Sequence, residues 1–79
     1  MTVDPDSVVP LFEQIAELLR ADIKSGKLPR GRRVPSELSL CQEFDVSRDT
    51  VRKSIRLLRD EELVVTRAGK GTFVAELKR

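Results

Sequence analysis

The chain has 79 residues, of which 39% are hydrophobic and 35% are charged, and its formal net charge is +2. A chain of this length supports one small hydrophobic core, and this composition is typical of a folded globular domain and excludes a disordered or collagen-like chain. The absence of His and the single Cys exclude a His-based catalytic triad and a Cys/His metal cluster, so we expect neither an enzyme nor a cofactor.

The first predicted element is an amphipathic helix from residue 10 to residue 25. Pro10 suits a first helical turn because its missing N–H has no partner there, and Gly26 suits the left-handed residue that ends a helix. Apolar residues recur at helical spacing, namely Leu11, Ile15, Leu18, Leu19 and Ile23. Residues 1–9 are expected to form an N-terminal tail without the features of a signal peptide.

Residues 27–35 contain two prolines, a glycine and three arginines, which predicts an exposed basic loop. A short extended piece is expected at Arg33–Val34, because the residue before a proline avoids the helical region. The arginines of this loop either keep the domain soluble or contact phosphate, and the residues favour neither alternative.

Ser36 is expected to cap a second helix of about two turns, with Glu37 in its first turn. The helix is expected to end at Asp45, because Asp tolerates the left-handed conformation of a sharp turn. Its predicted packing stripe consists of Leu38, Leu40, Cys41 and Phe44. Cys41 is interpreted as a small core residue, since nothing beside it indicates an activated thiolate.

Ser47 is expected to cap a third helix that runs to about Glu61. One side of this helix is predicted to pack on the other two helices and carries Val51, Ile55 and Leu58. About a quarter-turn away lies a second stripe, formed by Arg48, Arg52, Arg56 and Arg59. A helix with one packed side and an adjacent basic side can lie in the groove of a duplex.

Two β-rich runs follow, at residues 63–67 and 71–75. Between them stands Ala68-Gly69-Lys70, which indicates a hairpin turn because glycine adopts positive φ. Three helices and a hairpin in this order predict an α+β, mostly α fold, the winged helix-turn-helix, over residues 10–75. Residues 76–79 are expected to begin a linker.

The positive charge is concentrated in the second half of the chain. Residues 1–45 carry six basic and eight acidic side chains, whereas residues 46–79 carry nine and five. A basic half indicates a polyanionic ligand, although a solvated helix face gives the same count. The chain has no apolar run of the roughly 20 residues that a membrane helix needs, and its one Cys cannot form an internal disulfide, so a cytoplasmic location without membrane contact is expected.

Four motifs occur in order along residues 10–75: Pro10-Leu11-Phe12 with Gln14-Ile15, Pro-Ser-Glu-Leu-Ser-Leu at 35–40, Val-Ser-Arg-Asp-Thr-Val-Arg at 46–52, and Gly-Lys-Gly-Thr-Phe-Val at 69–74. In this combination the chain resembles the N-terminal DNA-binding domain of the GntR family of bacterial transcriptional regulators. Its proline-leucine opening is more similar to the HutC-type branch than to the others.

The resemblance implies a two-fold dimer on a palindromic operator, with the third helix in the major groove of double-stranded DNA and the hairpin wing in the minor groove. It implies that Arg48 and Arg52 read bases or phosphates, which suits the planar arginine fork. Ser47 and Thr50 would hold phosphates at a helix N-terminus. The further candidate contacts are Gly69 and Lys70 at the wing tip, together with Ser36, Asp49, Lys53, Arg67 and Arg33.

The chain departs from the family pattern at three positions. Leu38 stands where the family usually has Arg, so that contact is absent or moved to Arg32 or Arg33. Asp45 replaces the usual turn glycine. Asp49 replaces a common Thr, and its carboxylate either accepts a hydrogen bond from cytosine or repels phosphate.

Three side chains of the third helix have competing interpretations. Lys53 contacts either phosphate or Asp49, its neighbour at i−4. Arg56 and Arg59 are expected to form a solvated face, on which Arg56 pairs with Asp60 at i+4.

Two alternatives to operator binding stay open. The domain could be a winged helix that binds protein or RNA, or the DNA-binding part of a regulator fused to an aminotransferase-like domain, as in one branch of the family. The resemblance also implies an effector domain, missing from this chain, that dimerises and senses a small molecule. A repressor is the expected kind of regulator, whereas the operator, the effector and the regulated genes are not predicted.

Overall fold

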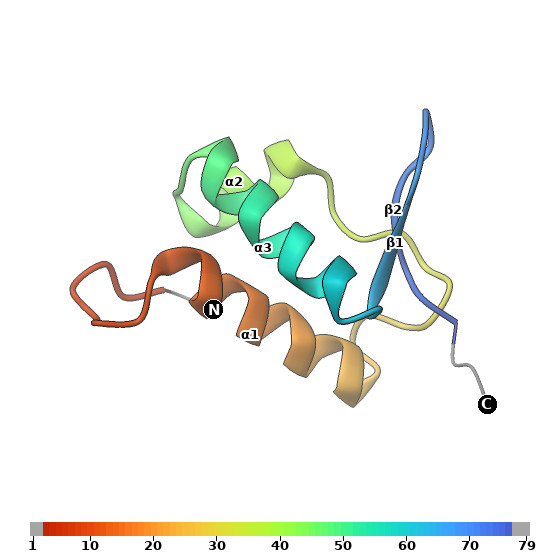
Figure 1. Ribbon diagram of the computed structural model, residues 1–79, viewed down its shortest axis with the longest axis horizontal. Helices are drawn as coiled ribbons and strands as arrows, with labels where there is room; N and C mark the ends of the chain where they lie inside the picture. Colours follow the sequence, from red (N-terminus) through yellow and green to blue (C-terminus); the bar gives the residue numbers. More distant parts are fainter. Residues whose placement is uncertain (1–2, 77–79) are drawn as a thin grey trace.

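The computed structural model describes residues 3–76, which form three helices followed by a two-stranded hairpin (Figure 1). The elements are α1 (Leu11–Ser25), α2 (Glu37–Phe44), α3 (Arg48–Asp60), β1 (Val64–Arg67) and β2 (Gly71–Val74). The predicted order of elements is confirmed, and each observed bound lies within one residue of the predicted one. Within the described residues, no helix combines the length and the apolar character needed to cross a membrane.

The helix ends follow from local side-chain and backbone chemistry. Ser36 Oγ accepts a hydrogen bond from the backbone N–H of Ser39 at 3.1 Å, and Ser47 Oγ accepts one from that of Thr50 at 3.3 Å. Gly26 and Asp45 end α1 and α2 in the left-handed conformation, with φ of 88° and 56°. Both serine caps and both left-handed ends are therefore confirmed.

The hydrophobic core lies between α1, α3 and the hairpin, and α2 covers one side of it. Its buried apolar residues are Ile15, Ala16, Leu19, Ile23, Val34, Leu40, Phe44, Val51, Leu58, Val64 and Val74. Ser54 is completely buried on α3, and its hydroxyl donates to the backbone oxygen of Phe12 at 2.7 Å. This hydrogen bond fixes α3 against the first turn of α1.

The predicted packing stripe of α2 is wrong at Leu38, whose exposed fraction is 54%. Leu38 and Leu40 are two residues apart, which places them about 200° apart around a helix, so they cannot both face the core. Leu40 is buried. Cys41 is half-buried against the edge of the core.

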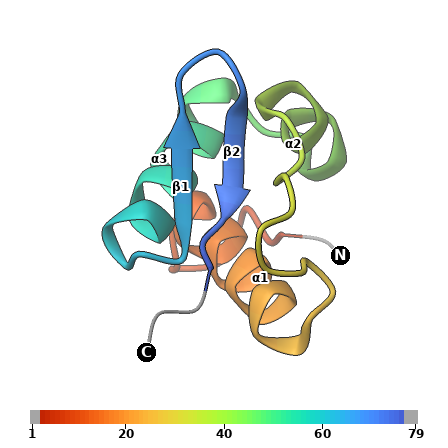
Figure 2. The same cartoon turned by 90° about the vertical axis from the view of Figure 1, so that its right-hand side faces the viewer.

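The hairpin is antiparallel, with Val64 opposite Val74 and Arg67 opposite Gly71. The expected extended piece at Arg33–Val34 is confirmed, since Arg33 forms a bridge with Phe73 and the N–H of Val34 donates to Thr72 O at 2.8 Å. The loop before α2 therefore runs along β2. Figure 2 shows the hairpin beside the helices, with its turn projecting past them.

Residues 3–9, expected to form a tail, are held against the helices by Gln14 of α1 and by packing of Val3. Gln14 Oε1 accepts a hydrogen bond from the N–H of Asp4 at 2.7 Å, and Gln14 Nε2 donates to the backbone oxygens of Asp4 and Val9, both at 2.8 Å. Val3 packs against the core. The expected linker begins at Glu76, and its remaining residues, 77–79, lie outside the described part of the chain.

A bidentate ion pair connects α1 to the turn after α3. Arg20 donates from Nε and Nη2 to the two carboxylate oxygens of Glu61, each at 2.8 Å. These hydrogen bonds raise the pKa of Arg20 and lower the pKa of Glu61 from their usual values. Glu62 then adopts a positive φ of 65°, a conformation that sequence reasoning did not predict, and the chain reverses into β1.

Candidate nucleic-acid interface

The start of α3 presents the first group of predicted contact residues to solvent. Arg48 and Asp49 are exposed, and no hydrogen bond within residues 3–76 involves their side chains. Ser47 and Thr50 share one hydrogen bond between their hydroxyls, at 3.1 Å. Because only one of the two hydroxyl protons is used in it, the pair keeps one O–H donor for an external acceptor.

Arg52, one turn further along α3, is held by a contact that the sequence did not predict. Its Nε donates to Oε2 of Glu37, in the first turn of α2, at 3.1 Å. The two side chains are 55% and 43% exposed. An ion pair exposed to this degree contributes about 0–1 kcal/mol to the free energy of folding. The Nη atoms of Arg52 form no hydrogen bond within the described residues.

The turn of the wing carries Gly69 and Lys70, both exposed. The N–H of Lys70 donates to the backbone oxygen of Arg67 at 3.0 Å and closes the turn. Gly69 has φ of 74°, and a Cβ added to it would meet no atom within 4 Å. Glycine is therefore needed here for its backbone conformation, and space at the wing tip is open.

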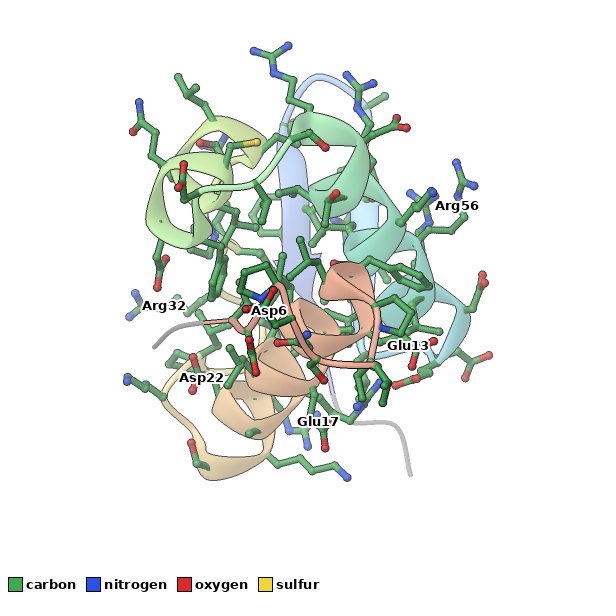
Figure 3. The ribbon with its side chains drawn as sticks, turned by 90° about the vertical axis from the view of Figure 1, so that its left-hand side faces the viewer. Asp6, Glu13, Glu17, Asp22, Arg32 and Arg56 are labelled. Atoms are coloured by element: carbon green, nitrogen blue, oxygen red, sulfur yellow. The ribbon has the colours of Figure 1, made fainter. Side chains whose placement is uncertain are left out.

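Arg33 lies against the wing near its turn. A Cβ built on Gly71 would stand 2.8 Å from Arg33 Nε, so a larger residue there would move this guanidinium from its place beside the wing. Arg33 also lines one groove together with Ser36 and Leu38. Arg32, in contrast, projects from the opposite side of the molecule from Arg56 (Figure 3). Of the two candidates to replace the family arginine at Leu38, Arg33 is therefore the better placed.

Ser36, the predicted contact at the start of α2, uses its hydroxyl proton within the helix cap. Its Oγ donates to Oγ of Ser39 at 3.1 Å. The hydroxyl proton of Ser39 is therefore the one left for an external acceptor. Sequence reasoning missed Ser39, although a serine three residues after a serine cap was a signal for this arrangement.

A second groove separates α3 from the wing and brings basic and hydroxyl side chains together. It is lined by Glu37, Arg52, Ile55, Arg56, Arg59, Thr66 and Thr72. Arg59 Nη1 donates to Thr66 Oγ1 at 3.0 Å, and this oxygen lies 3.3 Å from Thr72 Oγ1. Arg59 thus connects the end of α3 to β1 and, through Thr66, to β2. Arg59 is nevertheless exposed, as expected for a solvated face.

Two ion pairs considered for α3, the expected Arg56–Asp60 pair and the Lys53–Asp49 alternative, do not form within the described residues. Within residues 3–76 the ion pairs are Arg20–Glu61 and Arg52–Glu37, so Arg56 does not pair with Asp60. Lys53 does not pair with Asp49 either, because its Nζ lies 6.0 Å from the ring centroid of Phe12 on α1. A cation over an aromatic face is stabilised by the ring quadrupole, which holds Lys53 toward α1.

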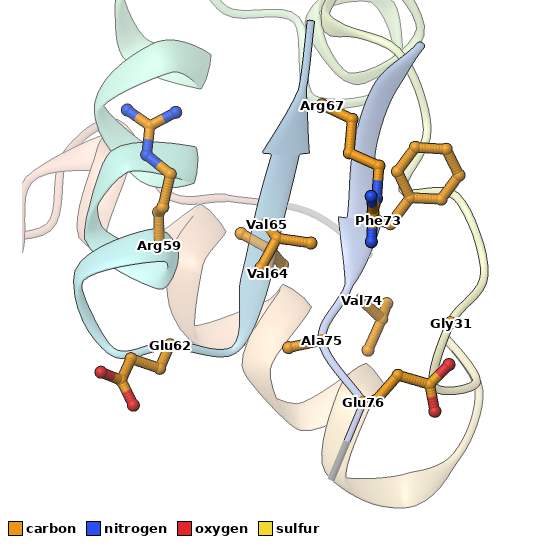
Figure 4. Close-up of a pocket in the computed structure, with 10 residues that line it drawn as sticks. All are labelled: Gly31, Arg59, Glu62, Val64, Val65, Arg67, Phe73, Val74, Ala75 and Glu76. Atoms are coloured by element: carbon orange, nitrogen blue, oxygen red, sulfur yellow. The ribbon is translucent and has the colours of Figure 1, made fainter. Parts of the chain in front are cut away.

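The side chains of Arg67 and Val65 point to the same outer face of the hairpin, because alternate residues of a strand share a face. Both line a shallow groove with Phe73, and Figure 4 shows this surface from the side of the wing. Val65 is 40% exposed and pairs with Phe73 across the strands. The structure therefore directs Arg67 along the outer side of the wing, whereas Lys70 stands at its turn.

Acidic side chains gather on a different part of the surface. Figure 3 labels Asp6, Glu13, Glu17 and Asp22 around the outer side of α1, away from the wing. Arg56 of α3 is labelled on another side in the same view. These four acids therefore lie apart from Arg56, which favours a polyanion on that part of the α3 surface.

Comparisons with known proteins agree with this geometry. The chain is 37% identical to the HTH-type transcriptional repressor NagR of Bacillus subtilis over 78 residues, which is 99% of this chain and 32% of NagR. It is 41% identical to the histidine utilization repressor of Klebsiella aerogenes over 69 residues, 87% of this chain and 29% of that protein. The chain therefore spans about a third or less of these curated relatives.

Among solved structures, the chain is similar to AraR(DBD) in complex with operator ORX1. The TM-score is 0.88, the sequence identity is 35%, and the match covers 95% of each chain. Similarity to a histidine utilization repressor agrees with the resemblance to the HutC-type branch. The family model described as "Bacterial regulatory proteins, gntR family" matches residues 11–74. The chain thus belongs to the gntR family of bacterial regulatory proteins.

Proposed function

We propose that this chain binds double-stranded DNA at a palindromic operator and is the DNA-binding part of a transcriptional repressor. The observation that carries the proposal is the position of Arg48 and Arg52. Both stand at the exposed start of α3, and the Nη groups of Arg52 and the whole guanidinium of Arg48 are without partners in residues 3–76. Such groups match the two acceptors of guanine in the major groove.

The remaining predicted contacts have roles consistent with their positions. The free O–H of the Ser47–Thr50 pair and the N-terminus of α3 suit a phosphate, as does Ser39 beside Ser36. Lys70 at the wing turn suits the minor groove, which attracts cations. Leu38 stands where the family usually has arginine, and Arg33, beside the wing, is proposed to supply that contact instead. Asp49 suits a cytosine amino group.

Two predicted contacts are proposed for less direct roles. Arg67 follows the outer face of the wing and suits a phosphate beside the minor groove. Lys53 lies over Phe12 and can contact phosphate only by leaving that ring. We therefore assign Lys53 the weakest contribution among these residues.

Two further proposals concern the parent protein. A palindromic site is read by two copies of a domain, so we infer that the parent is a homodimer. Its relatives are about three times longer than this chain, and a repressor needs a signal, so we infer a further domain that binds a small-molecule effector.

The proposal is tested by selecting duplexes from a random pool with the 79-residue chain at low salt. We expect an enriched sequence, bound with an affinity that falls at least about tenfold between about 50 and 200 mM salt, because phosphate contacts release counterions. Single-stranded RNA of the same base composition serves as competitor. Absence of any enriched duplex, or stronger binding of the RNA, would overturn the proposal.

A further inference from the structure

The contact between Glu37 and Arg52 joins the first turn of α2 to the exposed side of α3. Resting on the proposed function, we propose that Glu37 is a positioning residue. It fixes the guanidinium plane of Arg52 so that this side chain discriminates the operator from other DNA. Glu37 itself contacts no base in this proposal.

The atoms used in the contact leave the reading end of Arg52 free. A guanidinium has five N–H donors in one plane, one on Nε and four on the two Nη atoms. Glu37 takes the donor on Nε, at 3.1 Å. A guanine offers two acceptors, O6 and N7, which the Nη atoms can meet together. The carboxylate therefore orients the fork without competing for the groups that would read a base.

The support behind Glu37 is rigid. Glu37 follows the Ser36 cap directly, and its carboxylate in the first helical turn is favoured by the positive end of the helix dipole. The helix behind it is anchored by Leu40 and Phe44, which are both buried in the core. An arginine free in solution would lose more side-chain freedom on binding than one already held in this way.

A carboxylate at this place also opposes indiscriminate binding. Glu37 lines both the groove beside Arg33 and the groove beside Arg56 and Arg59, so it stands among cations that would attract any phosphate. Its negative charge weakens that attraction for every sequence alike. An Arg52 released from Glu37 could follow a phosphate instead of a base, since phosphate contacts carry no sequence information.

These two effects predict a distinctive change in E37A. Affinity for the selected duplex should fall, while affinity for a scrambled duplex of equal composition should stay the same or rise. The ratio of the two affinities should therefore fall, by about fivefold or more. Loss of structure would lower both affinities together, so the ratio separates positioning from a structural role.

The experiment measures Kd for both duplexes at one salt concentration, with E37A, E37Q, R52A and the double variant E37A/R52A. E37Q keeps an acceptor oxygen for Nε, so we expect it to keep a larger share of the ratio than E37A. In the R52A background, E37A should leave the ratio unchanged. E43A is the matched control, since Glu43 is an exposed acid of α2 that forms no ion pair within residues 3–76.

Three results would overturn the inference. They are an unchanged ratio in E37A, an equal fall of the ratio in the R52A background, and an equal fall in E43A. If E37A does not fold, E37Q alone decides, because an unchanged ratio together with an unchanged salt slope in E37Q contradicts the role of the carboxylate. Failure of the proposed function looks different, since the wild-type chain would then select no duplex at all.

Discussion

Arg59, in the last turn of α3, donates a hydrogen bond to Thr66 Oγ1 on β1 over 3.0 Å. The same hydroxyl lies 3.3 Å from that of Thr72 on β2. This side chain thus adds a hydrogen-bonded link between α3 and the wing, beside the core packing of Val64 and Val74. Under the proposed function α3 and the wing contact the same duplex, so this link affects how both are presented to it.

We predict that R59A and T66V loosen the wing without unfolding the domain. Each removes one exposed side-chain hydrogen bond, which contributes about 0.5–1.5 kcal/mol to the free energy of unfolding. Amide hydrogens of β1 and β2 should exchange faster, and affinity for the selected duplex should fall. R56A is the matched control, because it removes a guanidinium from the same groove and breaks no hydrogen bond within residues 3–76. Equal exchange rates in R56A and R59A would contradict the role of Arg59.

Gly71 and Gly69 should respond differently to alanine. Gly71 has φ of 119° and a Cβ there would stand 2.8 Å from Arg33 Nε, whereas Gly69 has φ of 74° and open space. Both replacements incur backbone strain of about 1–3 kcal/mol, and G71A must also displace Arg33. Denaturant unfolding should show the larger loss of stability for G71A. DNA affinity should fall more in G71A than in R33A. If G71A is as stable as G69A, the close contact between Gly71 and Arg33 is refuted.

The ion pair between Arg20 and Glu61 predicts a dependence of stability on pH. Arg20 lowers the pKa of Glu61 below its usual value of 4.5. A lowered carboxyl pKa means that the unfolded chain binds the proton more readily, so the contribution is present above pH 4.5 and is lost as the pH falls through the lowered pKa. Because both side chains are partly exposed, the contribution is at most about 1 kcal/mol.

This dependence is measured by urea unfolding of wild type and E61Q. At about pH 7 the wild type should be more stable by this amount, and the difference should shrink toward zero at about pH 2–3. R20M removes the partner of Glu61. In the R20M background, E61Q should therefore cause no loss of stability at neutral pH. A difference that persists unchanged in acid would show that the stabilisation does not come from ionised Glu61.

Ser54 is completely buried, and its hydroxyl donates to Phe12 O at 2.7 Å. We predict that S54A lowers the free energy of unfolding by about 1 kcal/mol, because α3 loses this bond to α1. S54V should be worse, since a branched side chain overpacks the contact between the helices. Thermal unfolding measures both. Duplex affinity of the folded S54A chain should equal that of wild type, since Ser54 faces away from solvent.

Local signals predicted most of the fold. Ser36, Ser47 and Gly26 act within one helical turn of their own position, so their chemistry is visible in a short window of sequence. The extended piece at Arg33–Val34 was predicted because Pro35 restricts the backbone of the residue before it. The failure at Leu38 came from counting apolar residues without assigning each one an angle around the helix.

Contacts between distant elements could not be predicted in the same way. Glu37 and Arg52 are 15 residues apart, and their distance depends on the angle between α2 and α3. Arg59 reaches Thr66 only because Glu62, with φ of 65°, reverses the chain. Lys53 had an acidic neighbour at the right helical spacing, yet the aromatic ring of Phe12 on another helix holds it. Where a side chain has several possible partners within reach, the packing of the elements determines which one it contacts.

Arg48 and Arg52 are proposed to read the operator from the exposed start of α3. The most direct measurement is the affinity of R48A/R52A for the selected and scrambled duplexes, beside K24A/K27A, which removes two charges from the end of α1. We expect each arginine to contribute roughly 1–3 kcal/mol, so R48A/R52A should lose most of its preference while K24A/K27A keeps it. An R48A/R52A chain that binds the selected duplex at unchanged concentration with unchanged preference would contradict the claim.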